Sequence, residues 1–554
     1  MKITFLFSIF LIALQAQAQQ TVGLMQYKSS NLDGYVLFSP VSNDTTYLID
    51  KCGKKVHQWS SARKPGLSSY LLSDGSLLKT GAIPNPNFNS NGATGGLIEK
   101  IDWNNNLVWS YRISDSLHTQ NHDIYPMPNG NILVVVWVNI KPTVAIAAGR
   151  NPSLLGTSLW SAEIYELQPS GTSNATIVWQ WKFWDHLIQD FDNTKSNYGV
   201  VANHSELLNL NFNGSNTATS VDWLHVNAVT YNPTLDQIMI SSHNLSEIYI
   251  IDHSTTTAQA AMHAGGNHNK GGDFLYRWGN PQAYNHGIST DQKLFQQHNP
   301  TWIPAGYKDA GNIMIFNNGV GRSGGNSASV DIIAQPVDAN GDYTFPTGTN
   351  PFAPSAAYWS YSANPPSSFF TPVMGGAQRL SNGNTIICEA TSGNFFEIDS
   401  NKNTVWQYIN PVGSTGAIAQ GTTSTTLGCF RCTLFEPNFA GFTGHSLIAS
   451  KPIEINPLSP GICDTLNSGV AAFDNTQKVF DIFPNPSNQT FTIQLFDNST
   501  NHKIVMTDVL GRVVFQSDQV FSGTKKSATI NVENLPNGIY FIQAGNETKK
   551  IIKE

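Results

Sequence analysis

A short phrase of sequence recurs through residues 20–460 and constrains the fold more than any other feature. Each copy has an apolar run ending in Asp or its equivalent, a Gly/Asn turn, and a second run containing Trp. The copies occupy residues 47–59, 101–109, 164–181, 250–278, 330–359 and 396–406. A turn followed by another apolar run precedes several of them, at 74–77, 128–132, 311–313 and 382–386. Such units, spaced by about 50 residues, are typical of propeller blades.

Six copies predict an all-β chain whose main part is a six-bladed β-propeller around a central channel. Two packed sandwiches are the alternative architecture, but they explain the periodic Trp residues less well. Longer gaps between copies indicate loop insertions, which tend to gather on one face and carry function.

The N-terminus has the pattern of a secretory signal peptide over residues 1–18. Met1-Lys2 is followed by an apolar run over 3–14 and by Ala16-Gln17-Ala18, an A-x-A cleavage site. The run is shorter than the roughly 20 residues that span a bilayer, and no later stretch approaches that length. We therefore expect an exported mature chain without a transmembrane segment. The propeller is predicted over residues 19–465, a linker over 466–478 and a further domain over 479–554.

The C-terminal region alternates apolar and polar residues between Pro/Asn/Gly turns, which predicts six or seven short strands in a small β-sandwich. It resembles the sorting domain of the type IX secretion system. The matching segments are 483–486, 508–511, 535–540 and Lys549-Lys550. The resemblance implies that the type IX machinery exports the protein through the periplasm to the cell surface or the medium. The alternative is a carbohydrate-binding sandwich.

Charge and cysteine content exclude several classes of protein. The chain of 554 residues has 31 basic and 38 acidic residues, a net charge of −7, and no Lys/Arg run that would bind nucleic acid. Five cysteines are too few for a disulfide-built scaffold. Cys429 and Cys432 are close enough in sequence to form a bridge, or a metal or redox site, but no second CxxC accompanies them.

Three of the 14 histidines occupy equivalent points of three blades, just before a turn and an apolar run. They are His122, His225 and His298, and we expect them to converge at the mouth of the channel together with Asn227. Three imidazoles are able to bind zinc or iron, although no HxH or HExxH spacing supports a metal. They also suit structural hydrogen bonds between blades, or a nucleophilic imidazole flanked by proton donors.

Five stretches resemble the bacterial aryl-sulfate sulfotransferases: 120–137, 222–252, 275–281, 297–318 and 381–411. This resemblance implies a six-bladed propeller that passes a sulfuryl group from a phenolic sulfate to a phenol through a covalent sulfohistidine, without a nucleotide or other cofactor and without a metal. By motif position His298 matches the nucleophile. His122, His225 and Asn227 match the residues that hold the sulfuryl oxygens and handle the leaving-group proton.

One position departs from the family pattern. His243, in Ser241-Ser242-His243-Asn244, stands where the family usually has an arginine. Because histidine is charged only at lower pH, we expect weaker binding of the sulfuryl oxygens, unless Arg277 or Arg322 substitutes. His243 would equally suit a blade interface. Trp223 is expected to stack on the aromatic ring of the substrate, although blade packing explains it as well.

These observations predict an exported sulfotransferase acting on phenols. The sequence leaves two alternative functions open: a cell-surface binding propeller without activity, and a metal-dependent hydrolase that uses the histidine cluster.

Overall fold

The computed structural model describes residues 20–88, 95–422, 424–458, 463, 480–495, 501–508, 512–520, 527–544 and 547–554. The predicted signal peptide 1–18 and linker 466–478 lie outside these residues. The chain divides into two units, Met1–Pro460 and Gly461–Glu554.

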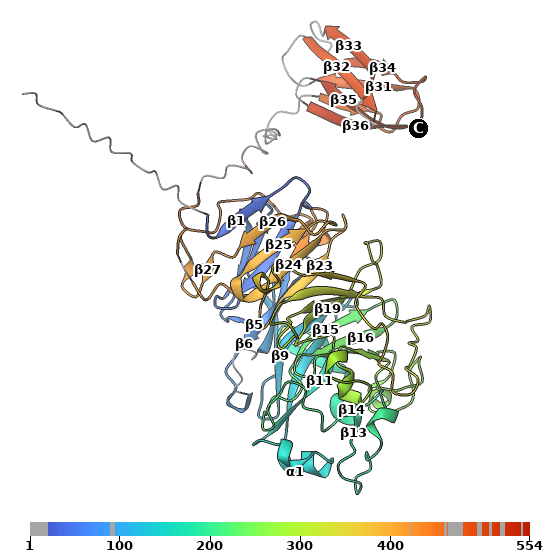
Figure 1. Cartoon of the computed structure of the whole chain (residues 1–554). Helices are drawn as coiled ribbons and strands as arrows, with labels where there is room; N and C mark the ends of the chain where they lie inside the picture. Colours follow the sequence, from blue (N-terminus) through green and yellow to red (C-terminus); the bar gives the residue numbers. More distant parts are fainter. Residues whose placement is uncertain are drawn as a thin grey trace, which may run out of the picture. The chain divides into compact units, whose positions relative to one another are not determined.

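The described part of the first unit contains six antiparallel sheets of four or five strands (Figure 1). The first sheet holds β2 (Tyr35–Pro40), β3 (Thr45–Asp50), β4 (Lys55–Ser60) and β29 (Cys429–Phe435). The second holds β5 (Pro65–Leu71), β6 (Leu77–Ala82), β7 (Gly96–Ile101) and β8 (Leu107–Arg112). The third holds β9 (His118–Pro126), β10 (Ile132–Ile140), β11 (Leu159–Ser170) and β12 (Asn174–Lys182).

The other three sheets follow in chain order. The fourth holds β15 (Val226–Asn232), β16 (Gln237–Ser242), β17 (Glu247–Asp252) and β18 (Tyr276–Trp278). The fifth holds β19 (His298–Trp302), β20 (Ile313–Asn317), β21 (Ser329–Ile333) and β22 (Trp359–Tyr361). The sixth holds β23 (Gly376–Arg379), β24 (Thr385–Glu389), β25 (Asn394–Ile398), β26 (Thr404–Ile409) and β1 (Gly23–Tyr27).

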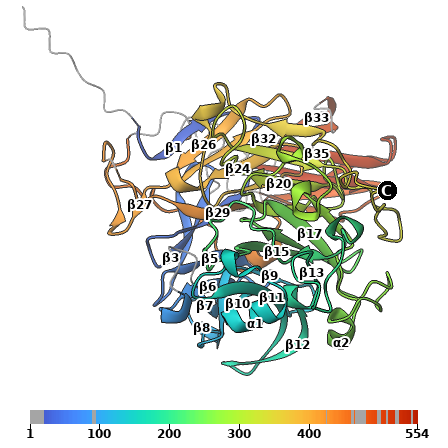
Figure 2. The ribbon, with the colours of Figure 1, turned by 60° about the horizontal axis from the view of Figure 1, so that its bottom comes forward.

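The innermost strands of the sheets lie against one another in a closed ring, which runs from β29 through β5, β9, β15, β19 and β23 back to β29. Figure 2 shows several of them near the middle, with β3, β8 and β12 farther out. Two exchanged strands close the ring, because β29 pairs with β2 and β1 pairs with β26. The predicted all-β propeller is confirmed. The number of six blades stays a prediction, which these six sheets support.

The recurring sequence phrases account for the strands. The turns before β6, β10 and β24 each contain a glycine with positive φ: Gly75 (+81°), Gly130 (+86°) and Gly383 (+86°). Side chains brace the same turns, since Asn129 Oδ1 accepts from the Asn131 N–H at 2.9 Å. After them comes an apolar run such as β10, which is buried over most of its length.

Short elements fill the connections. They are α1 (Pro142–Ala147), α2 (Thr257–Ala260), β13 (Leu187–Ile188), β14 (Leu208–Asn209), β27 (Val412–Gly413) and β28 (Gly416–Ala417). Single turns of 3-10 helix occur at Pro86–Phe88, Pro152–Leu154, Phe183–Asp185, Val201–Asn203, Pro281–Tyr284, Ser289–Asp291, Pro366–Ser368, Ala390–Ser392 and Ala440–Phe442. Within the described ranges, every helix is too short or too polar to cross a membrane.

Cys429 and Cys432 do not form the bridge that their spacing allows. Both are buried free thiols, as is Cys388, whereas Cys52 and Cys463 are disulfide-bonded. Both lie in β29, on either side of a register shift against β2, and both pack with Cys388 in one apolar core.

The second unit is a small sandwich of two antiparallel sheets. One sheet holds β30 (Phe480–Phe483), β31 (Thr490–Leu495) and β34 (Ser527–Asn531). The other holds β32 (Asn501–Asp508), β33 (Val513–Val520), β35 (Gly538–Ala544) and β36 (Glu547–Lys553). Both sheets contribute to one apolar core, for example through Phe491 and Ile542, as the alternating pattern predicts.

Candidate active site

The innermost strands of three neighbouring sheets are irregular at the histidines. His122 and His225 have φ of +47° and +45°, and Asn299, next to His298, has +47°. The pairing register shifts beside each of them. Bulges of this kind re-aim side chains and are frequent next to active sites.

Four imidazoles meet where these strands converge, and we call them the channel cluster: His122, His225, His243 and His298. The ring centroids of His122 and His225 are 4.5 Å apart. The next distances along the cluster are 4.8 Å, from His225 to His243, and 5.4 Å, from His243 to His298. The sequence prediction that remote histidines converge therefore agrees with the geometry, and His243 belongs to the same cluster.

Three of the four rings are hydrogen-bonded to amide side chains. The Asn121 amide nitrogen donates to His122 Nδ1 at 3.0 Å. His243 Nδ1 lies 2.7 Å from Asn244 Oδ1, and His298 Nδ1 lies 2.8 Å from Asn318 Oδ1.

The orientation of each amide fixes the tautomer of its ring. The amide nitrogens of Asn121, Asn244 and Asn318 donate to backbone carbonyls of Val226, Asp222 and Thr371, respectively. His122 therefore accepts at Nδ1 and carries its proton on Nε2. His243 and His298 instead donate from Nδ1, which leaves an unprotonated Nε2 on each ring.

His225 differs because its partner is a carboxylate. Its Nδ1 lies 2.5 Å from Asp222 Oδ2, and 22% of its side chain is exposed. The carboxylate accepts from Nδ1 and so holds the ring in one orientation, which leaves Nε2 of His225 to exchange a proton.

The lone pair of His298 is engaged in the structure. The backbone N–H of Met374, a residue with φ of +61°, donates to His298 Nε2 at 3.1 Å. Any reaction at this nitrogen requires the bond to open.

Burial keeps the other rings neutral. It lowers the pKa of His298 to about 3, and the nearby charges of His225 and Arg431 act in the same direction. Burial likewise holds the pKa of His122 and of His243 well below the ordinary value. A neutral imidazole is the nucleophilic form at physiological pH.

Arg431 is a buried cation beside the cluster that sequence reasoning missed. It forms a bidentate pair with Asp123, with Nη2 at 2.7 Å from Oδ2, and also donates to the hydroxyl of Tyr70 at 2.9 Å. The negative charge of Asp123 raises the pKa of the guanidinium against the effect of burial. Arg431 lies on β29, the strand that closes the ring, so no local pattern links it to Asp123.

Many buried polar atoms at the channel cluster have no hydrogen-bond partner among the described residues. These atoms are Gln120 Nε2, Asn121 Oδ1, Trp137 Nε1, Asp222 Oδ1, Asn227 Oδ1, His243 Nε2, Gln297 Oε1 and Arg431 Nε. An unpaired buried polar atom costs about 1–3 kcal/mol, so their concentration here indicates a site for a polar ligand or water.

Asn227 has a different contact from the one predicted. Its amide nitrogen donates to the Gln297 carbonyl at 2.7 Å, next to His298. Gln297 in turn donates to the Ser241 hydroxyl at 2.9 Å. Asn227 therefore supports the backbone that carries His298, and only its unpartnered Oδ1 is left for other contacts.

Two residues predicted to bind substrate lie elsewhere in the propeller. Arg277 forms an ion pair with the buried Glu247 and donates to the Leu207 carbonyl at 2.9 Å, so its charge is already neutralised. Trp223 is buried in an apolar core, and its Nε1 donates to the Phe212 carbonyl at 2.9 Å. Both predictions were wrong, because Arg277 is paired with the neighbouring strand of its own sheet and Trp223 packs in the apolar core.

Arg322 lies in the connection after β20. Its Nη2 donates to Ser329 Oγ at 2.9 Å, and its guanidinium lies 5.6 Å from the ring centroid of Phe295. None of its contacts among the described residues reaches the channel cluster, so the structure does not make it a replacement for the family arginine.

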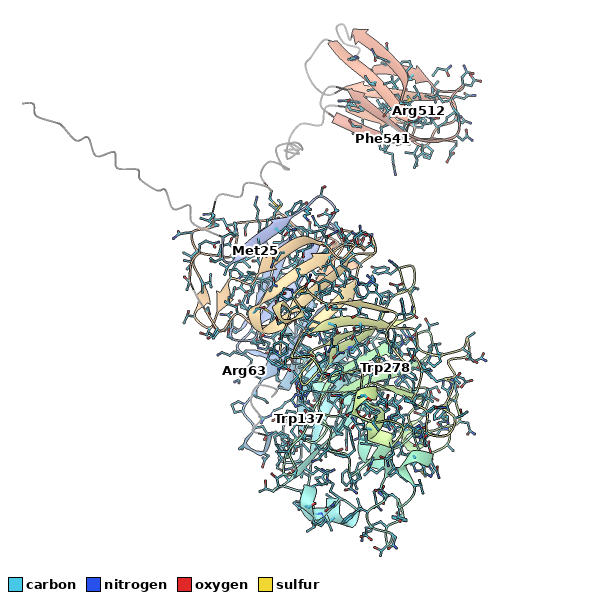
Figure 3. All side chains as sticks on the ribbon, viewed as in Figure 1. Met25, Arg63, Trp137, Trp278, Arg512 and Phe541 are labelled. Carbon is cyan, nitrogen blue, oxygen red and sulfur yellow. The ribbon has the colours of Figure 1, made fainter. Side chains whose placement is uncertain are left out.

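Trp137, labelled in Figure 3, presents an aromatic surface to the channel cluster, although its side chain is fully buried, as that of Trp223 is. Its ring centroid lies 5.9 Å from His122 and 6.0 Å from His225. Phe88 and Trp160 extend this surface, with centroids 6.3 Å and 5.1 Å from Trp137. The sequence does little to mark Trp137 as a site residue, because it lies in the apolar run Val134–Trp137 of β10, which is typical of a buried core strand.

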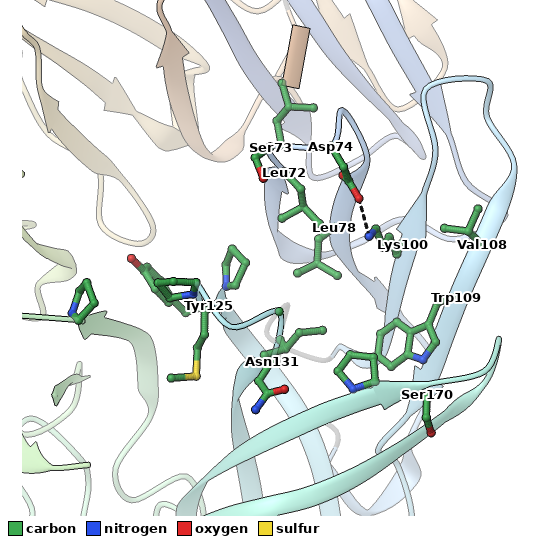
Figure 4. Close-up of a pocket in the computed structure, with 18 of the residues that line it drawn as sticks. Leu72, Ser73, Asp74, Leu78, Lys100, Val108, Trp109, Tyr125, Asn131 and Ser170 are labelled. Atoms are coloured by element: carbon green, nitrogen blue, oxygen red, sulfur yellow. Dashed lines mark hydrogen bonds and ion pairs between the residues drawn. The ribbon is translucent and has the colours of Figure 1, made fainter. Parts of the chain in front are cut away.

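The cavity of ≈ 710 Å³ drawn in Figure 4 is separate from this site. It is lined by residues of the second and third sheets, among them Leu78, Trp109 and Tyr125. Its charged residues, Asp74 and Lys100, form an ion pair at 2.7 Å. None of the predicted site residues lines this cavity, so we do not assign the chemistry to it.

The fold and the site define a class: an all-β propeller whose innermost strands bring neutral histidines together, joined to a secretion sorting domain. Residues 94–425 match the arylsulfotransferase (ASST) family, and residues 481–554 match the secretion system C-terminal sorting domain family. The chain belongs to the arylsulfotransferase family. The sorting domain directs export by the type IX system to the cell surface or the medium.

Solved structures with a similar arrangement are distant. A protein of unknown function from Bacteroides caccae is 10% identical, with a TM-score of 0.39, over 73% of this chain and 99% of its own. Virginiamycin B lyase from Staphylococcus aureus is 10% identical, with a TM-score of 0.31, over 72% of this chain and 91% of its own. A putative 6-phosphogluconolactonase from Bacteroides uniformis is 10% identical, with a TM-score of 0.34, over 68% of this chain and 83% of its own. No curated protein matches the sequence.

Proposed function

We propose that the protein is an exported sulfotransferase that transfers a sulfuryl group from a phenolic sulfate ester to a phenol through a sulfohistidine on His298. The observation that carries this proposal is the meeting of neutral imidazoles from separate blades, beside Trp137 and around unpaired polar atoms. Family membership supports the class of reaction.

In the first half-reaction, the Nε2 lone pair of His298 attacks sulfur while the bond from sulfur to the phenolic oxygen breaks. His225, oriented by Asp222 and entering the step as imidazolium, gives its Nε2 proton to the departing phenolate. Charge spreads onto the sulfuryl oxygens, as in phosphoryl transfer, and the Nε2–H of His122 is placed to donate to one of them.

In the second half-reaction, neutral His225 takes the proton of an incoming phenol, whose oxygen attacks sulfur. The N–S bond breaks, and His298 regains its lone pair. The hydrogen bond from Met374 to His298 Nε2 must open before the first attack, so substrate binding displaces this turn or rotates the ring. The adjacent Gly375 has φ of +110°, a conformation that larger residues rarely adopt.

The test is release of 4-nitrophenol from 4-nitrophenyl sulfate by the purified mature protein, with and without a phenol acceptor. Release that requires the acceptor is expected. His298→Ala should lower turnover by at least about 10³-fold with an unchanged circular dichroism spectrum. His118→Ala, which removes a partly exposed histidine of β9, is the control and should leave turnover unchanged. Full turnover of His298→Ala would show that the nucleophile is assigned wrongly.

A propeller that binds sulfated phenols without turning them over is the second candidate. Two observations favour it: His243 lacks the permanent charge of the family arginine, and Met374 occupies the lone pair of His298. Saturable binding of 4-nitrophenyl sulfate, with no acceptor-dependent release of product, would support this candidate.

A further inference from the structure

A second group of potential ligands lies away from the channel cluster. His186 follows the short turn Phe183–Asp185, His263 lies in the connection after α2, and Asp273 precedes β18. One nitrogen or oxygen from each residue lies within 4.8 Å of the others. We call this group the outer site.

Both histidines point the same nitrogen at the same oxygen. His186 Nδ1 lies 2.7 Å from Asp273 Oδ1, and His263 Nδ1 lies 2.8 Å from it. Two imidazole nitrogens and a carboxylate oxygen form a ligand set that suits zinc and related divalent metals.

The ring of His186 is held in one orientation. Its Nε2 lies 2.9 Å from the Ala260 carbonyl, which only accepts, so the proton is on Nε2. Its ring also stacks on Trp181 at 5.4 Å with planes 5° apart. Gly272 permits this packing, because a Cβ there would lie 2.1 Å from the Ala260 carbonyl oxygen and 2.6 Å from His186 Nε2.

This orientation places the Nδ1 atom of His186 in an unfavourable contact. In a neutral ring protonated at Nε2, the Nδ1 lone pair faces a carboxylate oxygen at 2.7 Å, which is repulsive. The contact needs a positive charge, supplied either by a second proton on His186 or by a cation. The hydrogen bond from Nε2 to a backbone carbonyl is the outer contact that metal-binding histidines usually make.

We propose that His186, His263 and Asp273 bind Zn²⁺, with water as the fourth ligand. Tetrahedral ligands about 2.0 Å from zinc lie about 3.3 Å from one another, so binding moves the three side chains slightly apart. His263 is able to make this adjustment because its side chain is 61% exposed. It also lines a solvent-accessible cavity of ≈ 780 Å³, which gives the ion a path of entry.

A bound ion would connect two segments that are distant in sequence, because His186 lies 87 residues from Asp273, whereas His263 lies only 10 residues from it. Residues next to the ligands, such as Leu187 and Phe274, belong to the core in which Trp181 and Trp223 are buried. Zinc that binds only the folded state raises its stability in proportion to the logarithm of the free zinc concentration. The proposed role is structural, so it does not depend on the proposed sulfuryl transfer.

The experiment measures Zn²⁺ bound per chain, by elemental analysis after dialysis and by titration against a zinc-binding dye, on the mature full-length protein. We expect one equivalent in the wild type. His263→Ala should weaken binding by at least about 10-fold, since one of three protein ligands is lost. His204→Ala is the matched control, because His204 lines the same cavity and pairs with Glu206 instead of Asp273.

Thermal unfolding provides a second measurement. Added Zn²⁺ should raise the Tm of the wild type and of His204→Ala, but not that of His263→Ala. Absence of bound zinc in the wild type, or equal zinc binding by His263→Ala, would overturn the proposal. Zinc lost in His298→Ala but kept in His263→Ala would place the metal in the channel cluster and would also overturn it.

Discussion

The propeller holds its histidines in two contrasting kinds of environment. In the channel cluster, His298 is bonded to the amide of Asn318, and burial lowers its pKa to about 3. Elsewhere, His253 lies 2.7 Å from Asp236 and 3.0 Å from Glu166. Burial opposes the charge of His253, but hydrogen bonds to these two carboxylates and their negative charges outweigh it and raise the pKa to about 9.

The contrast shows that the partner atom decides whether burial keeps a histidine neutral. An amide oxygen fixes the tautomer, but its hydrogen bond is too weak to offset burial, which leaves a neutral nitrogen with a lone pair. A carboxylate favours imidazolium or, where two rings converge, a metal ion. Only His225 in the channel cluster has a carboxylate partner, and this suits it to proton transfer next to a nucleophile.

Asp222→Asn is the change with the largest expected effect on this contrast, because it gives all four channel histidines amide partners. We expect turnover to fall by about 10²–10⁴-fold, since the imidazolium of His225 loses its stabilising charge. The loss should be larger for phenyl sulfate than for 4-nitrophenyl sulfate, whose leaving group needs a proton less. Steady-state kinetics with both donors measure it.

The control is Asp115→Asn, which removes the carboxylate 3.4 Å from His118 at the same sequence spacing. It should leave both rates unchanged. Equal rates for Asp222→Asn and the wild type would mean that His225 does not transfer the proton.

Three members of the channel cluster were expected to converge because each precedes a recurring turn. The phrase that forms each blade also fixes the position of His122, His225 and His298 at the bulge of an innermost strand. The contact of Asp222 with His225 could have been predicted from the sequence, since Asp222 stands three residues before His225. Nothing local marks the contact of Met374 with His298, because a loop 76 residues away makes it.

The sequence was a poorer guide to the direction in which each side chain points. Trp223 and Trp137 are both Trp residues near motif histidines, yet one packs in an apolar core and the other faces two imidazoles. The choice depends on the packing between blades. Arg431 reaches Asp123 only because β29 closes the ring, 308 residues away in sequence.

His243→Arg tests whether the cluster benefits from a permanent charge. His243 Nε2 is buried without a partner among the described atoms, so replacing the ring breaks no hydrogen bond at this nitrogen. We expect kcat/KM for 4-nitrophenyl sulfate to be unchanged or to rise by up to about 10-fold, because charged donors bind sulfuryl oxygens more strongly.

His243→Gln is the matched comparison, since it supplies a neutral amide in place of the charge and should give no gain. If the Arg variant folds normally but loses as much activity as the Gln variant, or more, then the site does not require a charge at this position.

The smallest expected effect is on the free energy of unfolding. Its pH dependence differs between a histidine of the channel cluster, His298, and a histidine with carboxylate partners, His253. His298, with a pKa of about 3 in the folded state against about 6.5 when unfolded, binds its proton mainly after unfolding. It therefore lowers the free energy of unfolding by about 1.4 kcal/mol for each pH unit below about 6.5. His253, with a pKa of about 9, acts oppositely: its stabilisation is complete below about 6.5 and is lost as the pH rises to about 9.

Urea unfolding across this range measures both slopes. His298→Gln should flatten the loss of stability on the acid side of about pH 6.5 and leave the alkaline side as in the wild type. His253→Gln should do the reverse. Slopes are the appropriate measurement, because each substitution also changes packing by an amount that does not vary with pH. An unchanged acid slope in His298→Gln would mean that the pKa of His298 is the same in the folded and the unfolded protein, so burial would not be what keeps the ring neutral.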